Sequence, residues 1–193
     1  MAVKSNFASG DVLTASDVNT YLTNGGLVYV AEGSGTNVAT LDVNSVFSST
    51  YDAYRLVIQL ASRSASQYMR LQYRTSGAVT TTNYYSSSRW YNMISGNTLF
   101  QDYDSNTGAV VLGPSGDQSA NHYTLQILDV LSPNLARATF ANGSGNGPQR
   151  GIAYYGWING GVQLDSTQFT GFRLVPNAGN FDYKYVVYGY RQA

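Results

Sequence analysis

The chain has 193 residues, with 11 basic side chains, 11 acidic side chains and no cysteine. A protein that binds duplex nucleic acid normally carries a surplus of basic residues, so a formal net charge of zero argues against that partner. The absence of cysteine excludes disulfide bonds and thiolate chemistry, and no apolar run approaches the roughly 18 residues that cross a membrane. A content of 17 tyrosines, 20 glycines and only 11% charged residues favours a β-rich protein with a polar, uncharged surface.

Residues 1–26 predict an N-terminal anchor segment that contains one short helix. Thr14 is a good N-cap, and the glycines at the end of the segment terminate the helix. A helix of about two turns is not stable alone, so its apolar side chains must dock on something. They contact either the rest of their own domain or a neighbouring protein. The anchor residues that we identify are Leu13, Val18, Tyr21 and Leu22.

After the anchor, residues 27–193 read as one β domain. The clearest strand covers residues 54–60, where Tyr54, Leu56, Ile58 and Leu60 alternate with more polar positions. The other predicted strands, in chain order, are residues 27–30, 38–43, 68–74, 98–103, 109–112, 123–130, 136–141, 152–158, 170–175 and 181–190, of which 38–43 and 98–103 have the weaker signals. Glycine-rich turns are expected at residues 33–35, 142–147 and 159–161.

The order of strands and turns predicts an all-β fold. Residues 54–60 and 68–74 suggest one hairpin, residues 170–175 and 181–190 suggest another, and residues 54–60 and 181–190 have the character of central strands. Because no repeat of fixed period occurs, a propeller or solenoid is not expected. We therefore predict an antiparallel β-sandwich, jelly-roll-like, preceded by the short helical anchor.

No set of residues in the sequence has the spacing of a catalytic site. His122 is the only histidine, and no nucleophile, phosphate-binding or dinucleotide motif is present, so we expect no enzyme and no cofactor. Asp102, Asp104 and Asn106 have the alternate spacing of calcium ligands. The glycine after them comes one place late and no closing glutamate follows, so a hairpin turn rich in Asx residues is the other interpretation.

Aromatic side chains are the remaining candidates for binding. Trp90, Tyr91 and Trp157 have rings that can stack on the apolar faces of sugars, and they are candidate glycan contacts. The alternative is that these rings pack in the core or at a subunit interface. If the protein recognises a glycan, we expect the contacts to come from long polar stretches at residues 75–121 and 142–150.

The anchor segment also carries a resemblance. Residues 6–22 contain three short sequence motifs: Gly10-Asp11, Leu13-Thr14-Ala15 and Asp17-Val18-Asn19. This segment resembles one found near the start, or at domain joints, of structural proteins of tailed bacteriophages, especially tail-fibre-like and minor tail proteins. The strand at residues 27–30, the segment 47–60 and the closing residues 186–191 are similar to small jelly-roll domains on phage surface appendages.

The resemblance implies a non-enzymatic structural protein of a tailed-phage virion, made in the host cytoplasm and exposed on the virion surface. Its expected partners are further copies of itself, as a homotrimer, and other virion proteins of the capsid or the tail. In a tail fibre the β domain binds a receptor such as a host surface glycan, whereas in a capsid decoration (cement) protein it stabilises the head. A free carbohydrate-binding β-sandwich module is the alternative. No nucleic acid, metal or membrane insertion is expected.

Overall fold

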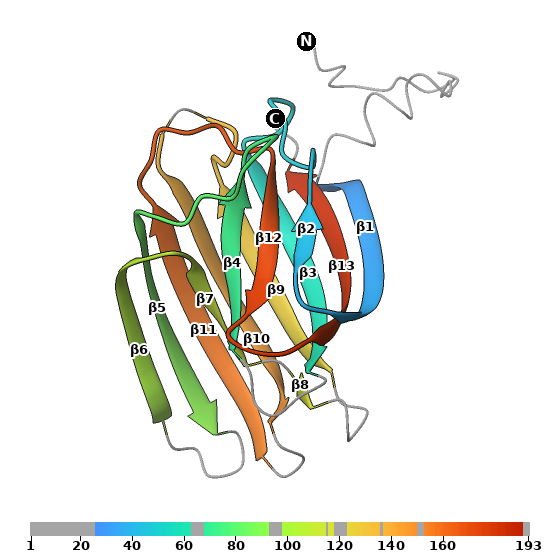
Figure 1. Ribbon diagram of the computed structural model, residues 1–193, viewed down its shortest axis with the longest axis vertical. Helices are drawn as coiled ribbons and strands as arrows, with labels where there is room; N and C mark the ends of the chain where they lie inside the picture. The colour runs from blue at the N-terminus through green and yellow to red at the C-terminus, as the bar shows by residue number, and fades with distance from the viewer. Residues whose placement is uncertain are drawn as a thin grey trace, which may run out of the picture.

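The computed structural model describes residues 26–62, 68–92, 98–114, 116–117, 123–135, 137–149 and 153–190. In this part of the chain two antiparallel β-sheets pack as a sandwich (Figure 1). The predicted all-β sandwich is therefore confirmed. The predicted N-terminal helix lies outside the described residues. The residues that are described contain no helix long and apolar enough to cross a membrane.

The larger sheet has nine strands, eight of which follow the order β1-β13-β3-β9-β10-β11-β5-β6. In that order they cover Leu27–Val38, Phe181–Tyr190, Ala53–Ser62, Thr124–Leu131, Thr139–Gln149, Ala153–Gln163, Tyr84–Asn92 and Thr98–Thr107. The ninth strand, β8 (Gly116–Asp117), pairs in parallel with β3. The smaller sheet has the order β2-β12-β4-β7, with bounds Leu41–Val43, Gly171–Pro176, Tyr68–Arg74 and Val110–Pro114.

The two strands that the sequence identifies as central, β3 and β13, are neighbours within the larger sheet. The predicted alternation of β3 is confirmed, because Tyr54, Leu56, Ile58 and Leu60 are fully buried. Their side chains share one core with buried residues of the smaller sheet, including Met69, Leu71, Tyr73, Phe172 and Leu174. Complete burial of such a side chain contributes about 1.5–3 kcal/mol, so this core holds the two sheets together.

Both predicted hairpins are wrong, although their strands exist. β3 belongs to the larger sheet and β4 to the smaller one, and β12 and β13 are divided in the same way. A turn reverses the direction of the chain, but it does not decide whether the next strand pairs with the previous one or stacks over it in the second sheet. The chain crosses between the sheets at each of these turns.

The first strand is longer than predicted, because its glycines are not a turn. β1 continues through Gly33 and Gly35 to Val38. A Cβ at Gly33 would lie 2.7 Å from the ring of Tyr185, and one at Gly35 would lie 2.6 Å from the ring of Tyr183. Missing side chains at these two positions let both tyrosine rings of β13 lie close to the backbone of β1.

The strands β10, β11, β5 and β6 continue the larger sheet beyond β9, and we call them the extension (Figure 1). β7, the last strand of the smaller sheet, packs on the inner face of the extension. Asn159 Nδ2 donates to the carbonyl of Leu112 at 2.8 Å, and the amide of Val111 donates to Ser86 Oγ at 3.3 Å. These hydrogen bonds join the backbone of β7 to inward side chains of β5 and β11, so they fix the smaller sheet on the extension.

Candidate functional site

The predicted anchor residues Leu13, Val18, Tyr21 and Leu22 lie outside the described residues, so their docking stays a prediction. Among the residues that the structure describes, no three His, Cys, Asp or Glu side chains gather to hold a metal ion. Asp102, Asp104 and Asn106 belong to the extended strand β6, whose backbone pairs with β5. The predicted hairpin turn at these residues is therefore wrong, and the backbone there is not the loop that a calcium site of that spacing requires.

The two tryptophans do not present their rings to solvent. Trp90 and Trp157 are only 3% and 2% exposed, on the inner face of the larger sheet. The ring of Trp90 lies 4.9 Å from that of Tyr68, and Trp157 Nε1 donates to Gln126 Oε1 at 2.8 Å. Stacking of either indole on a sugar does not fit this burial, and core packing, the other interpretation, does. Tyr91 is half-buried, with the Arg89 guanidinium 5.5 Å from its ring centre.

The position of Trp157 depends on the glycines of β10. Residues 142–149, predicted as a loop and as part of a recognition surface, belong to this strand, and residues 159–161, predicted as a turn, belong to β11. A Cβ at Gly145 would lie 2.4 Å from Trp157 Nε1 and 2.6 Å from the carbonyl oxygen of Leu125. The indole of β11 thus lies over the glycine of β10 and reaches Gln126 on β9.

The outward face of the larger sheet, opposite the core, carries a row of apolar side chains. Cross-strand pairing places Ala53, Leu131, Phe140, Val162 and Tyr85 side by side on β3, β9, β10, β11 and β5. Phe140 is 51% exposed and Leu131 is 48% exposed. Large exposed apolar side chains within the described strands also include Leu27, Tyr29 and Ile158, all of which lie on this face by register or alternation.

Two shallow hollows lie on either side of Phe140. One has a volume of about 380 Å³ and is lined by Leu131, Asp129 and Tyr190 among others, and the second, of about 370 Å³, is lined by Tyr85 and Val162 among others. Phe140 and Asn142 line both. The ring therefore stands between two apolar depressions of similar size. Such a surface suits an apolar side chain better than a charged group.

One polar cluster borders this apolar row. Arg55 donates from Nε and Nη2 to the two oxygens of Asp129 at 2.8 Å each, and Tyr190 Oη donates to Asp129 Oδ1 at 2.7 Å. The hydrogen bonds from Arg55 lower the pKa of Asp129. Burial, with the bond to Asp129, raises the pKa of Tyr190 to about 12. Because the two opposite charges compensate each other, the cluster adds no net charge to this face.

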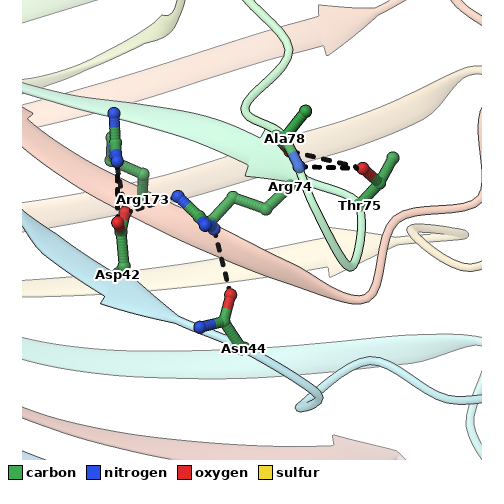
Figure 2. Close-up of polar contacts among 6 residues, drawn as sticks. All are labelled: Asp42, Asn44, Arg74, Thr75, Ala78 and Arg173. Atoms are coloured by element: carbon green, nitrogen blue, oxygen red, sulfur yellow. Dashed lines mark hydrogen bonds and ion pairs between the residues drawn. The ribbon is translucent and has the colours of Figure 1, made fainter.

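The outward face of the smaller sheet has the opposite character (Figure 2). Asp42 accepts hydrogen bonds from Arg173 Nε at 2.6 Å and Nη2 at 2.7 Å, and Arg74 Nη1 lies 2.8 Å from the same carboxylate. Arg74 Nε also donates to Asn44 Oδ1 at 3.0 Å. The hydrogen bond from Arg173 lowers the pKa of Asp42. These contacts connect β2 with β12 and β4, and they give this face a charged character.

Comparisons of the chain with protein-family models, with curated proteins and with solved structures find no match.

Sequence reasoning missed Leu131 and Phe140. A signal was present for Leu131, because β9 carries apolar residues on both faces: Leu128 and Val130 point inward, whereas Leu125, Ile127 and Leu131 alternate with them. A strand that is apolar on both faces is typical of a sheet covered on both sides.

Proposed function

We propose that the β domain is a jelly roll with two inserted hairpins. Without the hairpins β5–β6 and β10–β11 and the short β8, eight strands remain: β1, β2, β3, β4, β7, β9, β12 and β13. Numbered one to eight along the chain, their order is 1-8-3-6 in the larger sheet and 2-7-4-5 in the smaller sheet. This is the order of a jelly roll, the double-sheet architecture found in viral capsid and lectin domains. The two inserted hairpins make up the extension.

On this basis we propose that the chain is a non-enzymatic structural protein of a tailed-phage virion. In this role residues 1–26 anchor it, the β domain is exposed as a homotrimer, and other capsid or tail proteins are its partners. The jelly-roll strand order carries the proposal, and the resemblance of residues 6–22 to phage structural proteins supports it. The burial of Trp90 and Trp157 favours a capsid decoration (cement) protein over a glycan-binding tail fibre.

Purified virions of the parent phage test this proposal. We expect mass spectrometry to detect the chain in the particles, and antibody labelling in electron microscopy to place it on the head. Phage that lack the protein should lose DNA at a lower temperature and adsorb to cells at an unchanged rate. Labelling at the tail tip with slower adsorption would favour the tail-fibre role instead. Absence from purified particles would overturn the virion role altogether.

A free carbohydrate-binding module is the second candidate. The observation that favours it is the pair of hollows beside Phe140, where an exposed ring stands close to the polar side chains of Asn142 and Asp129. A glycan array with the isolated protein tests it, with Phe140→Ala as the control variant. Binding that disappears in the variant supports the module, and an array without signal rejects it.

A further inference from the structure

We propose that the outward face of the larger sheet binds a second copy of this chain, with the Phe140 ring of one copy seated in a hollow beside Phe140 of the other. This inference rests on the proposed self-association, but it does not depend on a place in a virion. It assigns the contact surface, which the sequence does not identify.

The uneven distribution of apolar side chains is the first argument. Leu131, Phe140 and Ile158 are 48%, 51% and 56% exposed on neighbouring strands of one face. The opposite face of the sandwich carries the Asp42–Arg173–Arg74 cluster instead. Scattered apolar residues are normal on a surface, but a contiguous group on one face marks an interaction site. Leu131, Phe140 and Val162 form such a group across β9, β10 and β11, and Ile158 lies four residues away along β11. β9, apolar on both faces, has the pattern of a strand that is covered twice.

The shape of the face is the second argument, and it favours a second copy over an unrelated protein. The same patch presents a projecting ring and, directly beside it, two hollows of about 370 and 380 Å³. A patch that carries both a projection and the depression to receive it is self-complementary, as symmetric contacts between identical subunits require. A ring without a hollow, or a hollow without a ring, would instead need a different partner.

Charge is the third argument. Within the described part of this face, Arg55 and Asp129 neutralise each other at 2.8 Å. Glu32 and Lys184 carry opposite charges on the neighbouring strands β1 and β13, and Arg89, opposite Ile158 on β11, is the remaining described cation. Because the two charges beside Phe140 cancel, two copies can bring their Phe140 patches together without net repulsion there. Arginine and tyrosine beside an apolar centre is also the composition of subunit interfaces. The same pairing of ring and hollow serves a two-fold or a three-fold arrangement, and the measured mass distinguishes them.

The first test measures the mass of the full chain by sedimentation equilibrium over a range of concentrations. We expect two or three times the monomer mass of 20.9 kDa. Phe140→Asp puts a charge at the centre of the contact and should raise the dissociation constant of the oligomer at least tenfold. Phe140→Thr is milder, because it keeps a strand-forming residue, and it should also raise the dissociation constant. The matched control is Val175→Asp, an apolar-to-acid change on β12 opposite Arg70, which should leave the mass unchanged.

The second test locates the contact by cross-linking, and it uses the absence of native cysteine. Ser144 is exposed on the outward face of β10, and Arg70 is exposed on β4 of the smaller sheet. Because a disulfide would require the two Cα atoms to lie within about 7 Å, a long flexible bismaleimide is used instead: we expect it to link Ser144→Cys subunits into covalent oligomers and to link none of the Arg70→Cys subunits. An oligomer that Phe140→Asp and Phe140→Thr leave intact would overturn the proposal.

A monomeric chain would also overturn the proposal. The rate at which the Ser144→Cys thiol reacts with a maleimide then shows whether something else covers the face. Slow reaction with a maleimide would mean that the N-terminal segment of the same chain covers the face. Fast reaction would mean that the face is free. Neither reaction rate tests the virion role. That role is tested by the presence of the protein in purified particles.

Discussion

At the scale of single residues, glycines determine where the aromatic rings of this protein lie. Gly33 and Gly35 make room for two tyrosine rings of β13, and Gly145 makes room for the indole of Trp157. Each of them lies inside a strand, where glycine has no side chain to pack and is otherwise unfavourable. Their presence is explained by the rings that approach the backbone, and this explanation is open to test.

Gly145→Ala should destabilise the protein, because the new Cβ would lie 2.4 Å from Trp157 Nε1 in a buried site that cannot easily expand. We expect the free energy of unfolding in urea to fall by about 1–3 kcal/mol, as for other overpacked cores. Gly160→Ala is the matched control, since the nearest atom to its Cβ is Asn142 Oδ1 at 3.7 Å. It should change stability by less than about 0.5 kcal/mol. Equal effects of the two substitutions would contradict the steric explanation.

Asp129→Asn should reduce stability at neutral pH and have less effect in acid. Arg55 lowers the pKa of Asp129 in the folded state below the value of about 3.9 in an unfolded chain. The ion pair therefore contributes stability above about pH 3.9, and the contribution disappears as the pH falls through the lowered pKa. Because the Asp129 side chain is 46% exposed, screening limits the difference at pH 7 to about 1 kcal/mol or less.

Urea unfolding of the wild-type chain and of Asp129→Asn, at pH 7 and pH 2, measures this difference. In an Arg55→Gln background the same substitution should depend less on pH, because the largest cause of the lowered pKa of Asp129 is absent and only the hydrogen bond from Tyr190 still lowers it. A difference between wild type and Asp129→Asn that stays constant down to pH 2 would exclude the ion pair as its origin.

At the scale of elements, alternation predicts strands but not their partners. β3, β4, β9 and β13 follow from the period of two in their sequences, and β4 has the predicted bounds of residues 68–74. The predicted strand at residues 136–141 reaches only the start of β10, and residues 142–149 of β10 and the far half of β1 were missed because their glycines have the composition of turns. The pairing within the two sheets depends on contacts between distant segments, such as Tyr185 with Ile58. No local pattern contains that information.

The candidate site shows the same limit. Successive residues of a strand face opposite sides, so the sequence predicts that one of each neighbouring pair leaves the core but not which one. Trp90 and Trp157 point inward, whereas Phe140, which the sequence did not single out, points outward. The row around Phe140 arises because β9, β10 and β11 are neighbours in the sheet, which only the topology decides.

Removal of residues 1–25 should leave the β domain folded but unable to join its parent assembly. The described core extends from Leu41 to Val187, and β1 pairs with β13 from Leu27 onward. We therefore expect a far-ultraviolet circular dichroism spectrum and a urea midpoint close to those of the full chain, and no incorporation into particles during infection. A truncated chain that fails to fold would show that the segment belongs to the core.

At the scale of the whole molecule, the sandwich presents two different surfaces. The smaller sheet exposes arginines and an aspartate held in ion pairs, and the larger sheet exposes aromatic and aliphatic side chains. The inserted hairpins β5–β6 and β10–β11 widen only the larger sheet, and they bring Phe140, Ile158 and Val162 to its outward face together with the polar side chains of Asn142, Ser144 and Arg89. In the proposed assembly the larger sheet faces other subunits and the smaller sheet faces solvent.

The same architecture predicts a gradient of local stability, which hydrogen–deuterium exchange measured by mass spectrometry can detect. β3 has hydrogen-bonded neighbours on both sides, β13 and β9, and its inward side chains from Tyr54 to Leu60 are fully buried under the smaller sheet. β6 is the last strand of the extension and has a neighbour, β5, on one side only. Local opening is easiest where backbone hydrogen bonds are exposed and buried apolar contacts are few.

Peptides from β3, β9 and β13 should therefore exchange most slowly. Peptides from β6 should exchange at least tenfold faster after correction for intrinsic rates. Equal protection of β3 and β6 would mean that core and extension open only together, as one cooperative unit.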